Sequence, residues 1–421
     1  MKKHNVLVFP CGSEIGLEVF RAINKNKDFN LFGGSSIDDH GRFVYENYID
    51  NIPFVDDDNF INKINEIITK YEIDLIIPAH DSVVLKLSEN SDKIDATIVT
   101  SSKLACDICR SKKKTYDLFK NLLPIPKIFK KEDVKSSDLP LFLKPSVGQG
   151  SKGTKKIETL EDLSVSYTTD DLLILEYLPG EEYTIDCFTD YKGNLVYCEG
   201  RVRDRILNGI SVNCKKFNDP NFIQFAEIIN KKIGMNGAWF FQLKRRENGE
   251  FVLLEIATRI AGTMEFQRGY GVNLALLSLY NALNIDTKII KNNYEIEFDR
   301  ALSGKFKFKF NYNTIYIDFD DTIIVNGKVN SEAIAFIYRA KNDNKKIILL
   351  TRHAFDIKKT LKKYCIGELF DEIINVDVEK PKSLFITDKD SIFIDDSYRE
   401  REDVSKKCDI PVFDIDMFEF L

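Results

Sequence analysis

Acidic side chains follow an apolar segment near the C-terminal end of the sequence, in the run Asp318-Phe319-Asp320-Asp321-Thr322. Side chains two residues apart on an extended chain point the same way, so Asp318 and Asp320 lie on one side of it. Such a pair can serve as a nucleophile and a general acid or base beside a magnesium ion. For this cluster alone, a solvated acidic turn is the competing interpretation.

Three further groups follow in the same kind of position. An apolar segment ends at Thr351, Lys380 comes shortly after Val376, and another apolar segment ends at Asp395-Asp396. Transfer of a phosphoryl group to an aspartate needs such a set. It uses a nucleophile, a hydroxyl and a lysine on the phosphoryl oxygens, and a further acid for the metal.

In these motifs the segment from about residue 313 to residue 421 resembles the haloacid dehalogenase (HAD) superfamily. The resemblance implies a phosphatase domain with an aspartate nucleophile. It assigns the nucleophile to Asp318, the acid or base to Asp320, the phosphate contacts to Thr351 and Lys380, and the magnesium ligands to Asp318, Asp320 and Asp395. Lys382 is the alternative lysine, and His353 could touch the leaving group.

The spacing of these motifs bears on access to the site. About 28 residues separate Thr322 from Thr351, and about 28 more separate Thr351 from Lys380. One helix with its connections fills each interval, which leaves no room for the cap domain that many members of this superfamily use to enclose small substrates. We therefore expect an open site, or one covered by the rest of the chain.

A glycine-rich run lies in the middle of the sequence. Lys144 ends an apolar segment and precedes a loop with glycines at 148, 150 and 153, where a flexible backbone can fold over phosphates while the ammonium meets them. The next apolar segment, residues 172–180, contains Glu176 and Tyr177. A connecting backbone there can bond an adenine, with an acidic side chain on the ribose.

Two oxygen-bearing side chains lie on a predicted hairpin. Gln242 is on the strand before Asn248-Gly249, and Glu255 is on the strand after it, so both can share one face of a sheet. With Arg259 just beyond, this arrangement suits Mg²⁺-ATP and a developing phosphoryl charge. If this pattern stood alone, an ordinary charged hairpin would be the favoured explanation.

Taken in order, residues 1–300 resemble the ATP-grasp superfamily, especially its carboxylate-amine ligase and carbamoyl-phosphate-synthase-like branch. The resemblance implies ATP and Mg²⁺ as cofactors. It assigns phosphate contacts to Lys112 and Lys144, the lid loop to Gly148, Gln149, Gly150, Ser151 and Gly153, the adenine border to Glu176, Tyr177 and Leu178, the ribose to Glu182, and the metal to Gln242 and Glu255. Arg259 would stabilise an acyl phosphate and the tetrahedral oxyanion, and Arg203 or Arg205 would bind the carboxylate substrate or phosphates.

One departure from the family pattern stands out. The family usually reads Glu-x-Asn-x-Arg, whereas this chain has Ala257 between Glu255 and Arg259, so an asparagine metal ligand is missing. Either the second magnesium is held by Glu255 alone, by water or by Gln242, or turnover is weakened.

These residues need elements that position them. Strand and helix signals alternate in the first hundred or so residues, as in a parallel sheet with a ligand crevice at its carboxyl ends. His80, Asp81 and His40 would then line the crevice or have surface or capping roles. We expect an α/β and α+β multidomain protein, with a Rossmann-like pre-ATP-grasp domain (residues 1–104), an ATP-grasp domain (105–305, lid about 127–190) and a Rossmannoid HAD-like domain (312–421).

Composition limits the classes of partner. The 421 residues carry 60 basic and 66 acidic side chains, a net charge of −6, which does not favour duplex nucleic acid. No run approaches the roughly 18 apolar residues of a membrane span, and no signal-peptide core follows Met1. We expect a cytoplasmic protein that acts on small molecules, without nucleic acid or membrane partners, and a homo-oligomer is compatible with the sequence.

Three functions remain open from the sequence. The first is a bifunctional enzyme, in which a carboxylate activated by ATP forms an amide with an amine and the phosphatase acts on a phosphorylated substrate or product. The second is an ATP-grasp kinase that transfers phosphate without ligation. The third is a nucleotide sensor that regulates the phosphatase, which the Ala257 departure favours.

Overall fold

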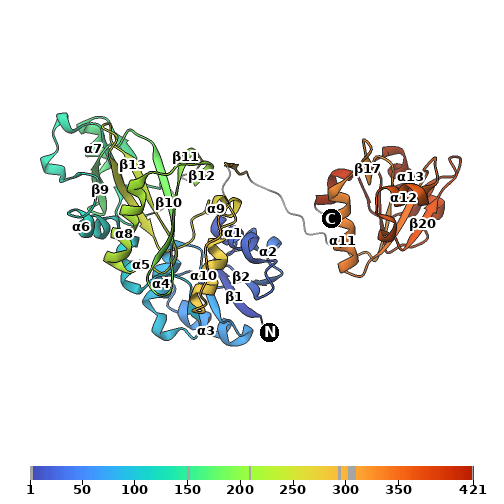
Figure 1. The fold of residues 1–421 in the computed structure, drawn as a ribbon, viewed down its shortest axis with the longest axis horizontal. Helices are drawn as coiled ribbons and strands as arrows, with labels where there is room; N and C mark the ends of the chain where they lie inside the picture. Colours follow the sequence, from blue (N-terminus) through green and yellow to red (C-terminus); the bar gives the residue numbers. More distant parts are fainter. Residues whose placement is uncertain (1–2, 149–151, 208–209, 293–294, 302–309, 420) are drawn as a thin grey trace. The chain divides into compact units, whose positions relative to one another are not determined.

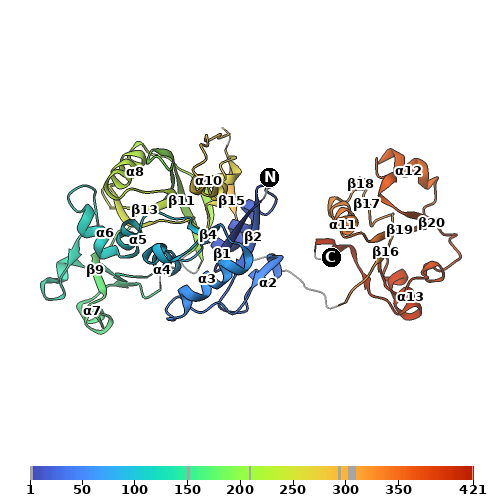
Figure 2. The same cartoon turned by 90° about the horizontal axis from the view of Figure 1, so that it is seen from below.

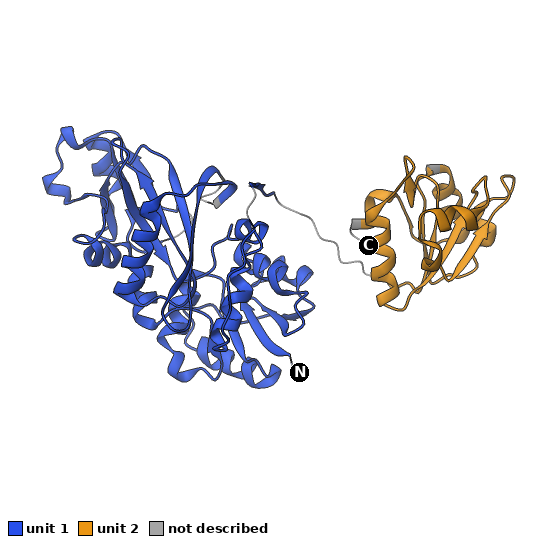
Figure 3. Cartoon of the chain, viewed as in Figure 1, with its two compact units in different colours: residues 1–303 blue, residues 304–421 orange. Residues whose placement is uncertain are grey.

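The chain is described by a computed structural model that covers residues 3–148, 152–207, 210–292, 295–301, 310–419 and 421. It divides into two compact units, Met1–Ser303 and Gly304–Leu421 (Figure 3). The predicted boundary between the ligase part and the phosphatase part, residues 305–312, lies close to this division. The first unit is not divided further at residue 104, because its parallel and antiparallel sheets share one core.

The first sheet of unit 1 is parallel, as the alternation of strand and helix signals predicted. Val6 and Val8 of its central strand face the core that contains α1, whereas Leu7 and Phe9 face the core that contains α3 and α4. Burial of both faces explains the continuous apolar run. The strand order is β3-β2-β1-β4-β5. The bounds are β1 (His4–Phe9), α1 (Glu14–Ile23), β2 (Phe29–Gly34), α2 (Gly41–Val44), β3 (Asn47–Ile49), α3 (Phe60–Tyr71), β4 (Leu75–Pro78), α4 (Asp81–Glu89) and β5 (Thr97–Ile98).

A small antiparallel sheet, ordered β6-β9-β7-β8, occupies most of the predicted lid (Figure 1). Leu163 of α7 packs on Leu141 and Leu143 of its central strand. The predicted lid range of about 127–190 extends too far, because the strand that begins at Glu182 belongs to the next sheet. The bounds are α5 (Lys103–Arg110), α6 (Lys112–Phe119), β6 (Ile128–Phe129), β7 (Leu141–Pro145), β8 (Lys155–Ile157), α7 (Leu160–Ser166) and β9 (Leu172–Glu176).

The largest sheet is antiparallel, in the order β14-β13-β10-β11-β12-β15. Helix α8 covers one face around the buried Trp239 and Phe241, and α10 lies on the side where Ala238 and Phe240 meet the core of the parallel sheet (Figures 1 and 2). The bounds are β10 (Glu182–Thr189), β11 (Leu195–Leu207), β12 (Ile210–Lys216), α8 (Pro220–Ile233), β13 (Gly237–Arg245), β14 (Phe251–Ala257), α9 (Glu265–Gly269), α10 (Leu274–Ala282) and β15 (Glu297–Asp299).

Unit 2 is built on a second parallel sheet, ordered β20-β19-β16-β21-β22. Side chains of its central strand alternate between two cores, with Ile315 and Ile317 on one face and Tyr316 on the other. Between β16 and β19 the chain forms a two-stranded hairpin and one helix, in keeping with the predicted lack of a cap domain. The bounds are β16 (Thr314–Ile317), β17 (Ile324–Val325), β18 (Lys328–Val329), α11 (Ser331–Asn342), β19 (Lys346–Thr351), α12 (Ile357–Lys363), β20 (Glu372–Asn375), β21 (Ser391–Ile394), α13 (Tyr398–Cys408) and β22 (Val412–Phe413).

Among the described residues, six short 3₁₀ segments accompany these elements: Ser91–Lys93, Lys131–Asp133, Ser136–Asp138, Gly367–Leu369, Lys382–Phe385 and Ile415–Glu419. In the part of the chain that the structure describes, no helix has the length and apolar character needed to cross a membrane.

Candidate active sites

Two adjoining cavities, of about 290 and 160 Å³, open within unit 1. The larger one lies where the carboxyl ends of β1 and β4 meet the middle of β13 and the carboxyl end of β14. The smaller one lies between the four-stranded and six-stranded sheets. Five residues line both cavities, namely Lys112, Gly148, Arg203, Gln242 and Glu255.

The smaller cavity gathers most of the predicted nucleotide-binding residues. Of these, Lys112, Lys144, Gly148, Glu176, Tyr177, Leu178, Glu182, Arg203, Gln242 and Glu255 line it. Gly153 adopts a left-handed backbone with φ of 72° and is not part of the lining. Gln149, Gly150 and Ser151 lie outside the described residues.

Two lysines bring positive charge to this cavity. Burial lowers the pKa of Lys144 to about 8, and its Nζ lies 3.5 Å from the carbonyl oxygen of Leu254. Burial also lowers the pKa of Lys112, whose Nζ donates to Gly148 O at 3.2 Å and lies 3.8 Å from Glu255 Oε2. Buried ammonium groups with so little compensation favour an anionic ligand.

Glu176 has a structural role in this cavity. Its carboxylate accepts from Lys127 N at 2.9 Å and from Arg246 Nη2 at 2.6 Å, which ties the end of β9 to the six-stranded sheet. The ring of Tyr177 lies between the ammonium groups of Lys156 and Lys244, 4.6 and 6.0 Å from its centroid. An adenine border formed here would therefore use the Tyr177 ring and the backbone more than the Glu176 carboxylate.

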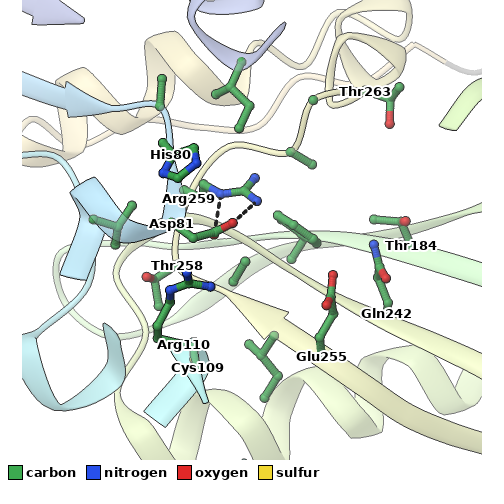
Figure 4. Close-up of a pocket in the computed structure, with 18 of the residues that line it drawn as sticks. His80, Asp81, Cys109, Arg110, Thr184, Gln242, Glu255, Thr258, Arg259 and Thr263 are labelled. Atoms are coloured by element: carbon green, nitrogen blue, oxygen red, sulfur yellow. Dashed lines mark hydrogen bonds and ion pairs between the residues drawn. The ribbon is translucent and has the colours of Figure 1, made fainter. Parts of the chain in front are cut away.

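The predicted metal ligands of unit 1 face one another. Gln242 and Glu255 are cross-strand partners on β13 and β14, and their side chains lie side by side in the larger cavity (Figure 4). Ala257 lines the same cavity two residues further on and offers no ligand atom. Among the described residues, Glu255 belongs to no cluster of three acidic, histidine or cysteine side chains close enough to share an ion.

Arg259 is bound to the parallel sheet by an ion pair. Its Nε and Nη2 donate to the two carboxylate oxygens of Asp81 at 2.6 and 2.8 Å (Figure 4). Burial raises the pKa of Asp81, but the positive charges of Arg259 and Arg110 lower it by more. The pKa of Asp81 therefore lies below its usual value. His80 and Asp81 line the larger cavity, and His80 caps α4 by accepting from Ser82 N; His40 is not in the lining.

Arg205 does not reach either cavity. Its side chain is 62% exposed and pairs with Asp299 at 2.7 Å. Arg203, which pairs with Glu182, lines both cavities instead. The two arginines are separated by a bulge in β11, so their strand positions did not predict which one turns inward. The prediction that Arg205 binds a ligand is thus corrected. Glu182, predicted to bind the ribose, forms an ion pair with Arg203.

Several polar residues of the larger cavity were missed by sequence reasoning. Arg110 donates to Gly148 O at 3.3 Å and to Ser82 Oγ at 3.1 Å, which links α5 to the glycine-rich loop and α4. Arg201 is buried in the lining and held by Asp186 at 2.8 Å. The remaining ones are Ser13, Glu14, Thr184, Ser211, Thr258 and Thr263. A polar residue at a buried strand position is the signal that could have identified Arg201.

A second candidate site lies at the strand ends of unit 2. Carboxylate oxygens of Asp318, Asp395 and Asp396 lie within 4.8 Å of one another. Lys382 Nζ donates to Asp318 Oδ1 at 2.5 Å and to Asp395 Oδ2 at 2.6 Å. Burial raises the pKa of Asp318 to about 7, although Lys382 opposes this shift. The cluster differs from the predicted metal set in containing Asp396 in place of Asp320.

The lysine of this site is Lys382, which corrects the prediction for Lys380. Lys380 points to solvent, 58% exposed, and pairs with Asp377 at 3.3 Å. The chain passes Pro381 into a 3₁₀ turn that begins at Lys382, and this turn directs Lys382 into the interior. Both lysines precede the last acidic pair by similar distances, so spacing did not separate them.

Thr351 and Asp320 complete this second site. Thr351 ends β19 fully buried, and its hydroxyl oxygen has no hydrogen-bond partner among the described residues. A buried hydroxyl without a partner is costly and is commonly satisfied by a ligand or water. The Asp320 carboxylate is exposed and lies 2.8 Å from His353 Nδ1.

Comparisons with known proteins bear on unit 1. Residues 168–300 match the sequence model of a family described as ATP-grasp in the biosynthetic pathway with Ter operon. No curated protein matches the chain significantly.

Solved structures share the fold at low sequence identity. A biotin carboxylase complex with β-γ-ATP from Campylobacter jejuni is 17% identical with a TM-score of 0.58, covering 69% of this chain and 74% of its own. The biotin carboxylase domain of Hydrogenobacter thermophilus 2-oxoglutarate carboxylase, in complex with MgADP, is 16% identical with a TM-score of 0.57, covering 71% and 73%. An L-amino acid ligase from Bacillus licheniformis is 14% identical with a TM-score of 0.55, covering 67% and 74%. Unit 1 of this chain therefore contains an ATP-grasp domain.

Proposed function

We propose that this chain is a bifunctional enzyme, an ATP- and Mg²⁺-dependent carboxylate-amine ligase joined to a phosphatase that uses an aspartate nucleophile. The observation that carries the ligase proposal is the pair of adjoining cavities in unit 1. One offers two buried lysines, the other offers Arg259, and Gln242 and Glu255 lie at their junction. A nucleotide in the smaller cavity would thus have its phosphates directed at a substrate in the larger cavity.

The residues of unit 1 support each part of this reaction. Lys112 and Lys144 would bind the phosphates, and the oxygens of Gln242 and Glu255 are donors of the kind that Mg²⁺ prefers. Bound magnesium would neutralise phosphate charge during transfer. A substrate carboxylate would attack the γ-phosphorus to give an acyl phosphate and ADP, and an amine would then displace phosphate to give the amide. Arg259 would stabilise the negative charge that develops in both steps.

Oxygen-18 in the carboxylate substrate tests the ligase directly. In a screen of paired carboxylate and amine pools, the amine displaces phosphate from the acyl phosphate, so the released inorganic phosphate must contain one labelled oxygen from the carboxylate. The Glu255→Gln variant must form less ADP. Lys155→Met, on an exposed strand position, is the matched control. A stable phosphorylated product formed without amine would instead identify a kinase. Nucleotide binding without ADP formation would identify a sensor.

The phosphatase proposal rests on the strand-end site of unit 2. Asp318 would attack the phosphorus, Thr351 and Lys382 would hold the phosphoryl oxygens, and Asp320 would protonate the leaving oxygen. The three clustered carboxylates are a suitable donor set for Mg²⁺, which would supply charge neutralisation when bound. The unpartnered Thr351 hydroxyl supports a ligand at this point.

The Asp318→Asn variant tests the phosphatase and its link to the ligase. We expect it to lose hydrolysis of p-nitrophenyl phosphate by about a thousandfold or more. In the screen with ATP, carboxylates and amines, the same variant should accumulate a phosphorylated amide that the wild-type protein hydrolyses. If Asp318→Asn hydrolyses p-nitrophenyl phosphate as fast as the wild type, the phosphatase proposal is contradicted. If the variant loses this hydrolysis but accumulates no phosphorylated amide, only the coupling of the two activities is contradicted.

A further inference from the structure

The general acid proposed for unit 2 is held by a histidine. Among the described residues, the Asp320 carboxylate has no hydrogen-bonding neighbour other than His353, whose Nδ1 lies 2.8 Å from Oδ2 and 3.1 Å from Oδ1. The Asp320 side chain is 52% exposed, whereas that of His353 is 9% exposed. The exposed Asp320 carboxylate, which would otherwise rotate in solvent, is thus held by a nearly buried imidazole ring.

The ring of His353 is itself held from several sides. Its Nε2 lies 3.0 Å from Thr360 Oγ1 on α12, and the edge of the ring meets Phe319 with centroids 5.2 Å apart at 78°. Asn375 Nδ2 donates to the His353 carbonyl oxygen at 3.2 Å. Phe319 is fully buried between the two aspartates of the motif, so the ring rests on the same turn that carries them. These contacts hold the ring with Nδ1 facing the Asp320 carboxylate.

We propose that His353 is a positioning residue that aims the Asp320 carboxyl at the leaving group of a phosphate ester. The inference rests on the proposed phosphatase function. As Asp318 forms its bond to phosphorus, the ester P–O bond breaks and Asp320 transfers its proton to the departing oxygen. The products are an aspartyl phosphate, an alcohol and the Asp320 carboxylate, which can then accept a proton from the hydrolytic water.

Dependence on the leaving group separates positioning from a general structural role. An alkoxide leaves poorly without a proton, so hydrolysis of n-butyl phosphate needs an aimed acid, whereas p-nitrophenolate leaves readily without one. His353→Leu keeps an apolar contact for Phe319 but removes both ring nitrogens. His353→Asn keeps a nitrogen at the place of Nδ1.

For His353→Leu we expect kcat/KM, which reports only the steps through formation of the aspartyl phosphate, to fall by about thirtyfold or more on n-butyl phosphate and by less than about threefold on p-nitrophenyl phosphate. His353→Asn should recover most of the lost rate. Because His353 acts through Asp320, the double variant Asp320→Asn/His353→Leu should be no slower than Asp320→Asn alone.

Three results would overturn the inference. These are equal losses on the two esters, no recovery in His353→Asn, or additive losses in the double variant. Thermal unfolding of each variant shows whether it is folded before its rates are compared. If the wild-type protein hydrolyses neither ester, or if Asp318→Asn is as active as wild type, the proposed phosphatase function itself fails and the inference with it.

Discussion

At the scale of single residues, charge burial decides how the two sites respond to their surroundings. Lys144 is buried in the lining of the smaller cavity, where burial lowers its pKa from 10.5 to about 8. Asp318 and Asp395 are buried together, and among the described residues Lys382 is the cation that pairs with both. The charge of Lys144 therefore depends on pH near 8, and the two buried carboxylates depend on Lys382 as their partner.

The first prediction concerns pH and Lys144. Because the protonated lysine binds phosphates best, nucleotide affinity should fall as the pH rises through about 8, by up to about tenfold per unit. Lys144→Met should bind more weakly at neutral pH and lose this dependence, and Lys155→Met should keep it. Isothermal titration calorimetry from pH about 7.5 to about 9.5 measures both effects.

A stability measurement checks the same shift without nucleotide. Between pH 8 and 10.5 the unfolded chain holds a proton on Lys144 that the folded chain has lost, so this lysine makes the free energy of unfolding rise with pH. The cost of burying the charge is fully present below pH 8. Lys144→Met should therefore raise the melting temperature at neutral pH, and a lower one would contradict the assignment of the shift to burial.

The second prediction compares two lysines that lie two residues apart. Lys382→Met leaves the buried Asp318 and Asp395 facing each other without a cation, which should destabilise unit 2 by about 3–5 kcal/mol and abolish ester hydrolysis. Lys380→Met removes only an exposed pair and should change stability by less than about 0.5 kcal/mol. Urea unfolding and p-nitrophenyl phosphate hydrolysis distinguish them, and similar effects in the two variants would contradict the corrected assignment.

At the scale of elements, the strands determine which side chains can meet. β14 presents Glu255 and Ala257 to the same cavity because side chains alternate along a strand. β13 opposes Glu255 with Gln242. Residues on paired strands are therefore the part of the site that a local pattern predicts well.

The third prediction uses this alternation. Ala257→Asn places an amide oxygen on the strand face that carries Glu255, where the family pattern has a metal ligand. It should lower the Mg²⁺ concentration for half-maximal ADP formation by about threefold or more. Ala257→Leu, whose side chain has the same number of heavy atoms and the same branching as asparagine but no oxygen, is the matched control. A titration of ADP formation with Mg²⁺ that shows no difference between the two variants would count against a metal site at this position.

At the scale of the whole molecule, the two units have separate interiors. Each core cluster among the described residues draws its side chains from one unit only. Unit 2 buries both faces of its sheet with its own helices, as a domain that folds by itself does.

The fourth prediction follows from this separation. A fragment of residues 310–421 should fold cooperatively and hydrolyse p-nitrophenyl phosphate at a rate within about threefold of the full chain. A fragment of residues 1–301 should bind nucleotide with unchanged affinity. Circular dichroism melts and rate measurements on both fragments are sufficient, and an unfolded 310–421 fragment would show that unit 2 needs the rest of the chain.

The sequence by itself determined the sheets, the division near residue 305 and the residues that local spacing places on one face, such as Gln242 with Glu255. The positions of Lys144 and Asp318 at strand ends were also predicted from the sequence, because an apolar strand followed by a turn is a local pattern. Tertiary structure alone decided that Lys382 and not Lys380 meets Asp318, that Arg203 and not Arg205 turns inward, and that Asp81 binds Arg259. In the first two cases two candidates had equivalent local spacing, and in all three, contacts between segments distant in the sequence decided the outcome.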